Sequence, residues 1–208
     1  ERARVLWGEA RPIEGTFAER YLVGRAIPRT ACASKALRFH PNVTSLDDQR
    51  RRPALVAAIA DAAGALQGVQ VTLLSPTGAG KAAVATPRRV IGAMRGGAVQ
   101  LTPAEPDLVI AEGVETALSA AAYFSVPAWA ALSASNLAEF TPPAVVKRLI
   151  IAADRDQPGL DAADRLAARL ADRLDVSIRP PEAGDDWNAA AKMETNAKRR
   201  DVGLESIS

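Results

Sequence analysis

The stretch DLVIAEGVETALSA, residues 107–120, decides the fold that the sequence predicts. Its residues 108–111 are all apolar, and a run without polar alternation is typical of a strand that is buried on both faces. Such a strand belongs in the middle of a parallel α/β sheet, and these sheets bind ligands beyond the carboxyl ends of their strands. Glu112 follows the strand at that edge, and Gly113 lets the chain turn there without placing a side chain beside the carboxylate.

A second stretch, KRLIIAADRDQPGLDAADRLAARL at 147–170, repeats the order of apolar strand, acidic turn and amphipathic helix. Asp154 and Asp156 are two residues apart, so in extended backbone both side chains project to the same side. Two carboxylates that are held together can share a hard cation. The stretch therefore predicts a second acidic strand end in the same sheet.

A third acidic turn, Asp185-Asp186, lies between an apolar strand and a helix. Asp186 and Asp156 also fit the role of helix N-caps, which needs no ligand. One cap is ordinary, but three acidic turns in one small sheet exceed what capping requires. The sequence therefore favours a cation site at the carboxyl edge of the sheet.

The two halves of the chain predict different architectures. After residue 106 strands alternate with helices, which indicates a parallel sheet covered by helices. Before it, two short helices and a β-hairpin predict a small α+β unit, and residues 102–106 are the expected linker. The expected strands are 37–40 (ended by Pro41), 55–60, 69–74, 98–101, 108–111, 128–132, 149–153 and 175–179. The expected helices are 1–10, 16–24, 115–124, 135–140, 159–173 and 188–198, with a polar tail after residue 200.

Charge is distributed unevenly between these halves. Residues 1–105 contain 15 Lys and Arg against 8 Asp and Glu, whereas residues 106–208 contain 11 against 16. A basic half beside an acidic half fits a polyanion-binding surface next to a cation site, although solvated faces alone would also give this pattern. The basic residues around the hairpin that could follow a nucleic acid are Arg50, Arg51, Arg52, Lys81, Arg88, Arg89 and Arg95.

Composition excludes several classes of protein. One Cys and one His cannot form a tetrahedral zinc site or a disulfide framework. Cys32 fits a reducing cytoplasm, which is the expected location. The sequence contains no apolar run long enough to span a membrane and no signal peptide. Because its first residue is Glu, we expect a piece of a longer chain.

The segment SPTGAGKA at 75–82 has part of a phosphate-binding loop. Ser75 stands where the first glycine of that loop is needed, and Ala82 replaces the hydroxyl residue that would bind magnesium. Pro76 also removes a backbone donor. We therefore reject an ATP-binding loop and expect a turn that presents Lys81.

The motifs EGVETALSA, ADRDQPG and GDDWN together resemble the Toprim domain, and most closely the DnaG-type primases of phages, plasmids and other mobile elements. RFHPN, the hairpin and RRVIGAMRGGAVQL are similar to the small basic domain that precedes Toprim in those proteins. The resemblance covers roughly residues 1–195 and implies an α/β fold, with a Toprim-type parallel sheet flanked by helices. It implies a basic α+β domain at 1–105, a Toprim domain at 106–200 and a tail at 201–208.

Two departures from the family pattern stand out. The zinc-binding module of DnaG-type primases and a helicase are absent from these residues. The aspartate expected four residues after Glu112 is replaced by Thr116, with Glu115 adjacent. These departures put the specificity of initiation and full activity in question, but they leave the metal site intact.

By resemblance, the chain is expected to be a Mg²⁺- or Mn²⁺-dependent DNA primase, a nucleotidyltransferase that makes short primers from NTPs during DNA replication. Its expected partners are a single-stranded DNA template and a replicative helicase, and no membrane. The catalytic residues implied are Glu112, Asp154 and Asp156, and the metal ligands are these three with Asp186. Further acidic candidates are Glu115 and Asp185, and the candidates for nucleic acid or nucleotide binding are Lys81, Arg88, Arg89 and Arg95.

Two other functions remain open on the sequence. The same carboxylates can activate water, which would make the chain a metal-dependent nuclease. A non-catalytic DNA-binding or interaction module could also keep the fold. Topoisomerase activity is disfavoured because it needs a nucleophilic tyrosine, and Tyr21 and Tyr123 lie in apolar contexts.

Overall fold

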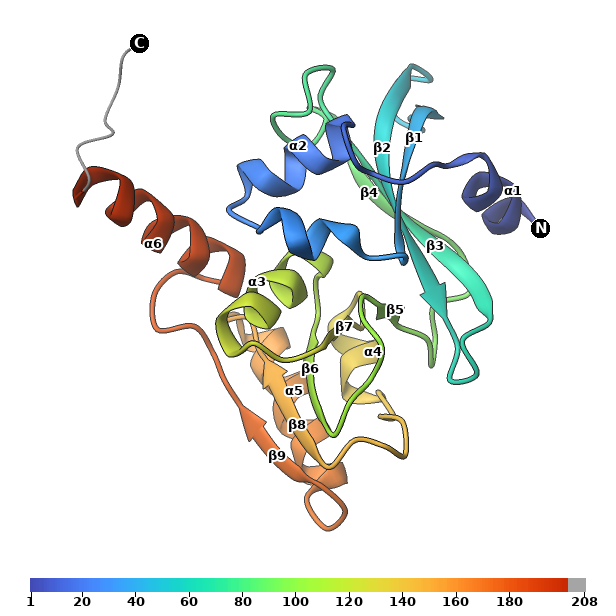
Figure 1. Cartoon of the computed structure of the whole chain (residues 1–208). Helices are drawn as coiled ribbons and strands as arrows, with labels where there is room; N and C mark the ends of the chain where they lie inside the picture. Colours follow the sequence, from blue (N-terminus) through green and yellow to red (C-terminus); the bar gives the residue numbers. More distant parts are fainter. Residues whose placement is uncertain (202–208) are drawn as a thin grey trace.

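A computed structural model describes residues 1–201 of the chain, with side chains as far as residue 197. Two sheets form its framework (Figure 1). The first sheet is antiparallel, with its strands in chain order. These strands are β1 (Leu37–Thr44), β2 (Arg51–Ala60), β3 (Leu66–Leu73) and β4 (Arg88–Gly92). The helices of this half are α1 (Arg2–Glu9), α2 (Phe17–Gly24) and a 3₁₀ helix (Arg29–Ala33).

The second sheet has the order β5–β7–β6–β8–β9, in which only β5 runs antiparallel to its neighbour. Its strands are β5 (Val99–Gln100), β6 (Asp107–Ala111), β7 (Ala128–Ala130), β8 (Arg148–Ala152) and β9 (Asp175–Ile178). The helices that follow them are α3 (Val114–Phe124), α4 (Ala134–Ala138), α5 (Gln157–Leu170) and α6 (Trp187–Asp201). The predicted parallel sheet flanked by helices is thus confirmed.

The central strands β6 and β8 are buried on both faces, as their unbroken apolar runs predict. Val109 and Ile150 pack on the face covered by α3 and the N-terminal half of the chain. Leu108 and Leu149 pack on the other face, against α4 and α5. Helix α6 lies beside α3 and extends away from both sheets (Figure 1). The carboxyl ends of β6 and β8 lie on the side of the N-terminal half (Figure 1).

The prediction that the first strand ends before Pro41 was wrong. β1 continues to Thr44, with a bulge between His40 and Val43. The proline is tolerated because β1 is an edge strand and the bulge interrupts its ladder. β4 was not predicted, since its five residues begin with two arginines and gain their strand conformation by pairing with β3.

The two halves are joined by more than a linker. Ala98 bridges Ala60 in the first sheet, and the next residues form β5 in the second. One buried cluster includes side chains of α2, β2, β6 and α3. The polar tail expected after residue 200 lies outside the described residues, except that Asp201 ends α6. No helix in the described part of the chain combines the length and apolarity needed to cross a bilayer.

Candidate active site

The acidic turns meet at the carboxyl edge of the parallel sheet. Glu112 follows β6, Asp154 follows β8, and Asp186 directly precedes α6. The three residues line one pocket of about 130 Å³. Its other lining residues are Arg25, Lys81, Arg88, Gly113, Glu115, Thr116 and Leu132. The pocket therefore combines carboxylates of the parallel sheet with cations of the N-terminal half.

Asp154 is the most perturbed of these carboxylates. Burial raises its pKa to about 7, and the nearby charges of Asp186, Glu112 and Asp156 act in the same direction. Its Oδ1 atom is buried and has no hydrogen-bond partner among the described residues. A buried acceptor without a donor calls for an explanation, and a bound cation is one group that satisfies it.

Glu112 and Asp156 occupy different settings. Burial, followed by repulsion from Asp156, raises the pKa of Glu112. Asp156 is exposed and caps α5, since its Oδ1 accepts a hydrogen bond from Gly159 N at 2.7 Å. Asp156 is close enough to affect both neighbouring carboxylates but does not line the pocket.

In the third acidic turn, too, only one of the two aspartates lines the pocket. Asp186 lines the pocket, and its Oδ1 accepts a hydrogen bond from Ala189 N at 2.6 Å, as an N-cap would. Asp185 does not line the pocket, and its backbone oxygen accepts from Arg155 N at 2.8 Å. Both aspartates proposed as caps therefore cap helices, and Asp186 also faces the pocket.

The donor set fits a hard divalent cation. All the candidate ligands are carboxylate oxygens, and Asp154 Oδ1 is buried without a partner in the described part of the chain. Within residues 1–197, no three acidic, histidine or cysteine side chains already form a cage for a metal ion. Magnesium does not require such a cage, because it retains waters and binds substrate phosphates. Glu112, Asp154 and Asp186 are the residues that could hold it.

Three cations of the N-terminal half face these carboxylates. Arg88 comes from β4, Lys81 from the turn before it, and Arg25 from the end of α2. The Nε atoms of Arg25 and Arg88 are buried without partners among the described residues. Burial, and then the charge of Arg88, lowers the pKa of Lys81. Unpartnered guanidinium donors of this kind suit phosphate oxygens.

The two other basic candidates are not brought to the pocket. Arg89 follows Arg88 along a strand, so it points to the opposite face. It donates to Thr44 O at 2.7 Å and lines a separate groove of about 930 Å³ along α1 and β4. Arg95 forms an exposed ion pair with Glu139 at 3.1 Å.

Glu115 has cations and a tyrosine as its partners. It is 4% exposed, and its Oε1 accepts hydrogen bonds from Tyr21 Oη at 2.6 Å and from Arg88 Nη2 at 2.8 Å. Lys81 Nζ lies 3.9 Å away. Burial acts to raise the pKa of Glu115, but Arg88, the Tyr21 hydrogen bond and Lys81 together lower it. Glu115 is therefore ionised and already paired.

Sequence reasoning missed Arg25 and Leu132. Arg25 stands after a helix end and has no motif around it that signals a site. Leu132 has φ = +75°, a left-handed conformation that is unusual for a bulky residue, and its N–H donates to Glu112 O at 2.7 Å. Strained backbone of this kind collects at functional sites, but only the folded chain reveals it.

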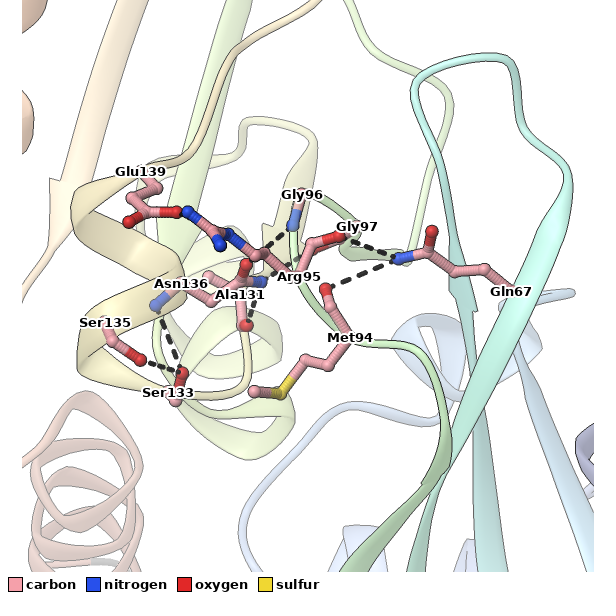
Figure 2. A network of polar contacts seen from close by, with 10 residues as sticks. All are labelled: Gln67, Met94, Arg95, Gly96, Gly97, Ala131, Ser133, Ser135, Asn136 and Glu139. Carbon is pink, nitrogen blue, oxygen red and sulfur yellow. Dashed lines mark hydrogen bonds and ion pairs between the residues drawn. The ribbon is translucent and has the colours of Figure 1, made fainter.

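Asn136 supports the chain at Ala131, the residue before Leu132 (Figure 2). Its Nδ2 donates to Ala131 O at 2.7 Å and to Gly97 O at 2.8 Å, and its Oδ1 accepts from Gly96 N at 2.9 Å. Asn136 is 5% exposed, so these bonds are shielded from water. The side chain thus joins the wall of the pocket to the turn between β4 and β5.

Comparison with known families defines the class of protein. Residues 107–197 match the family model of the Toprim domain, and residues 1–101 match a domain of unknown function, DUF7146. No curated protein sequence matches this chain. The family model thus identifies a Toprim domain in residues 107–197, as the acidic motifs predicted.

Solved structures with the same fold are primase cores. The primase fragment of the bacteriophage T7 primase-helicase is 16% identical, with a TM-score of 0.54, over 88% of this chain and 72% of that chain. A DNA primase domain from Pseudomonas aeruginosa is 15% identical, with a TM-score of 0.60, over 96% and 77%. The DnaG primase catalytic domain bound to ssDNA is 16% identical, with a TM-score of 0.62, over 96% and 76%. At these identities the likeness establishes the primase-core fold.

Proposed function

We propose that this chain is a metal-dependent nucleotidyltransferase that joins NTPs into short primers on single-stranded DNA. The proposal is carried by the buried, unpartnered atoms of the pocket: Asp154 Oδ1 is an acceptor, and Arg25 Nε and Arg88 Nε are donors. A metal-bound triphosphate would satisfy both kinds of atom, because a cation binds the carboxylate and phosphate oxygens accept from guanidinium groups. The Toprim domain and the primase-core fold support the same reaction.

In this proposal Glu112, Asp154 and Asp186 hold Mg²⁺ or Mn²⁺, and Asp156 adds an oxygen or orients the acidic turn. The metal would supply activation of the attacking 3′-hydroxyl and charge neutralisation on the leaving pyrophosphate. Lys81 and Arg88 orient the triphosphate. In the alternative arrangement Glu112 does not bind the metal, and its raised pKa then suits a general acid or base, which as a base would take the proton of the 3′-hydroxyl.

We assign template binding to residues 1–105, with a net charge of +7, and the metal site to residues 106–200. A DnaG catalytic domain of the same fold has been solved bound to ssDNA, and the T7 fragment comes from a primase-helicase. These relatives support single-stranded DNA and a helicase as partners of this chain.

The test is incubation of the protein with circular single-stranded DNA, labelled NTPs and Mg²⁺ or Mn²⁺, with products resolved on a denaturing gel. We expect short oligonucleotides from the wild type, reduced at least about 100-fold in Asp154→Asn, since a metal ligand is lost. Cleaved input DNA that disappears in the same variant would instead identify a nuclease. Neither product, even with a helicase added, would favour a non-catalytic module.

Adjacent arginines provide a matched pair of variants for nucleotide binding. Arg88→Gln removes a cation from the pocket, and we expect the KM for NTPs to rise about tenfold or more. Arg89→Gln removes the same charge on the opposite face of β4, so the KM for NTPs should stay within about twofold. If both variants raised the KM for NTPs equally, β4 would affect nucleotide binding only through its overall charge.

A further inference from the structure

Tyr21 and Glu115 form a buried pair between the two halves of the chain. Tyr21 is 1% exposed in α2, and Glu115 is 4% exposed in the first turn of α3. The 2.6 Å hydrogen bond from Tyr21 Oη to Glu115 Oε1 joins the two helices across the buried cluster. Desolvation and the nearby Glu115 charge raise the pKa of Tyr21, so the hydroxyl remains a donor.

All three cations of the pocket contact this pair. Arg88 donates to Glu115 at 2.8 Å, and Lys81 lies 3.9 Å from the same oxygen. The guanidinium of Arg25 lies over the Tyr21 ring, 5.8 Å from its centroid. The contacts leave the Nε donors of both arginines without partners in the described part of the chain.

We infer that the Tyr21–Glu115 pair positions Arg25, Lys81 and Arg88 toward the phosphate groups of the ligand, and that Glu115 does not bind the metal. The inference rests on the proposed triphosphate site. It assigns to Glu115 a role that acts through other side chains, because its buried carboxylate already pairs with Arg88 and Lys81, two cations of the N-terminal half. Tyr21, which the sequence placed in an apolar context, is thereby assigned a positioning role.

Two explanations of the role of Glu115 predict opposite effects of Glu115→Gln on triphosphate affinity. If only charge mattered, removal of an anion beside three cations would tighten the binding of a triphosphate. If Glu115 positions the cations, Arg88 loses its charged partner, and Lys81 loses the anion that favours its protonated form. Binding would then become weaker, so the direction of the change separates the two explanations.

The experiment is calorimetric titration of ATP in Mg²⁺ into four proteins: wild type, Glu115→Gln, Arg88→Gln and the double variant. We expect each single variant to bind ATP about tenfold more weakly, and the double variant to be little worse than either. This non-additivity is the signature of a residue that acts through Arg88. Mn²⁺ binding without nucleotide should be unchanged in Glu115→Gln.

Two further variants keep the test informative if Glu115→Gln does not fold. Tyr21→Phe keeps the ring beneath Arg25 but loses the hydroxyl, and we expect a roughly threefold loss of ATP affinity. Glu139→Gln is the matched control, because it removes the exposed partner of Arg95 away from the pocket and should leave ATP binding unchanged.

Tighter ATP binding in Glu115→Gln, additive losses in the double variant, or weaker Mn²⁺ binding would each overturn the inference. If the wild type does not bind ATP, the inference falls with the triphosphate site. Primer synthesis is not part of the readout. The protein could therefore fail to make primers and still show the non-additive losses of ATP affinity. That result would contradict the proposed polymerisation but support the positioning role.

Discussion

Asp154 is the residue at which the charges of the site conflict most directly. Its carboxylate is partly buried and is surrounded by the charges of Asp186, Glu112 and Asp156. Without a cation the ionised form is unfavourable, which is why its pKa rises from 3.8 to about 7. Between these two values the folded protein retains a proton that the unfolded chain has released. Its contribution to stability is therefore present at low pH and is lost as pH rises toward about 7.

We predict that Asp154→Asn stabilises the metal-free protein, and does so more at pH 8 than at pH 5. The neutral amide removes the repulsion, so the gain should grow between these pH values by on the order of 2 kcal/mol after allowance for solvent screening. Urea denaturation in EDTA measures it. Added Mg²⁺ should stabilise the wild type but not the variant, because the variant lacks a carboxylate of the proposed metal site.

Asp164→Asn is the control for this prediction, since Asp164 is exposed on α5. This exposed substitution should change the free energy of unfolding by less than about 0.5 kcal/mol. A pH-independent effect of Asp154→Asn would contradict the account of Asp154 as a carboxylate under repulsion.

At the scale of elements, α6 is anchored at its first turn. Trp187 packs against Tyr123 and Phe124 of α3 and donates from Nε1 to Arg179 O at 2.8 Å. Asn188 is fully buried, and its Nδ2 donates to Arg25 O at 2.7 Å and to Ser119 Oγ at 3.0 Å. α6 is thus attached to α3 and to the backbone of a pocket residue.

We predict that Asn188→Ala destabilises the protein by about 2–3 kcal/mol, because two buried acceptors lose their donor and a cavity remains. Asn196→Ala makes the same substitution at an exposed position of α6, where it should change stability by less than about 0.5 kcal/mol. Thermal denaturation of the two variants checks this pair. Because Asn188 holds the Arg25 backbone, its variant should also bind ATP more weakly, and an unchanged affinity would contradict that link.

At the scale of the whole molecule, two sheets with different topologies share one core. The buried cluster that covers β6 and α3 also contains side chains of α2 and β2. The chain passes from one sheet to the other within consecutive residues, where Ala98 pairs with Ala60 and Val99 pairs with Ala130. Residues 1–105 and 106–200 are therefore proposed as two functional regions of a single folding unit.

We predict that the two sheets unfold together. Native-state hydrogen exchange should give the slowest amides of β2–β3 and of β6–β8 the same opening free energy, within about 1 kcal/mol. The physical reason is that loss of either sheet exposes the shared core of the other. Protection that persists in β6–β8 at a urea concentration where β2–β3 exchanges freely would instead indicate two independent domains.

Much of this arrangement could be predicted from local patterns in the sequence. The apolar runs at 108–111 and 149–153 indicated strands buried on both faces, and the acidic turns after them indicated the pocket edge. That Glu112 and Asp154 lie together could be predicted because parallel strands bring their carboxyl ends to one edge, and Asp186 joins them in the same pocket. β4 and the course of β1 beyond Pro41 were missed, since pairing with neighbouring strands outweighs local propensity.

The sequence by itself determined most of the order of the elements, the parallel sheet and the acidic edge of that sheet, because these follow from periodicity and from residues next to one another in the chain. Only the tertiary structure decided which cations face the carboxylates. Arg88 reaches the pocket and Arg89 does not, because register with β3 sets which face each residue occupies. Tyr21 comes to Glu115, and Arg25 to the same pocket, from about 90 positions away in the sequence, through packing of a shared core that no local pattern encodes.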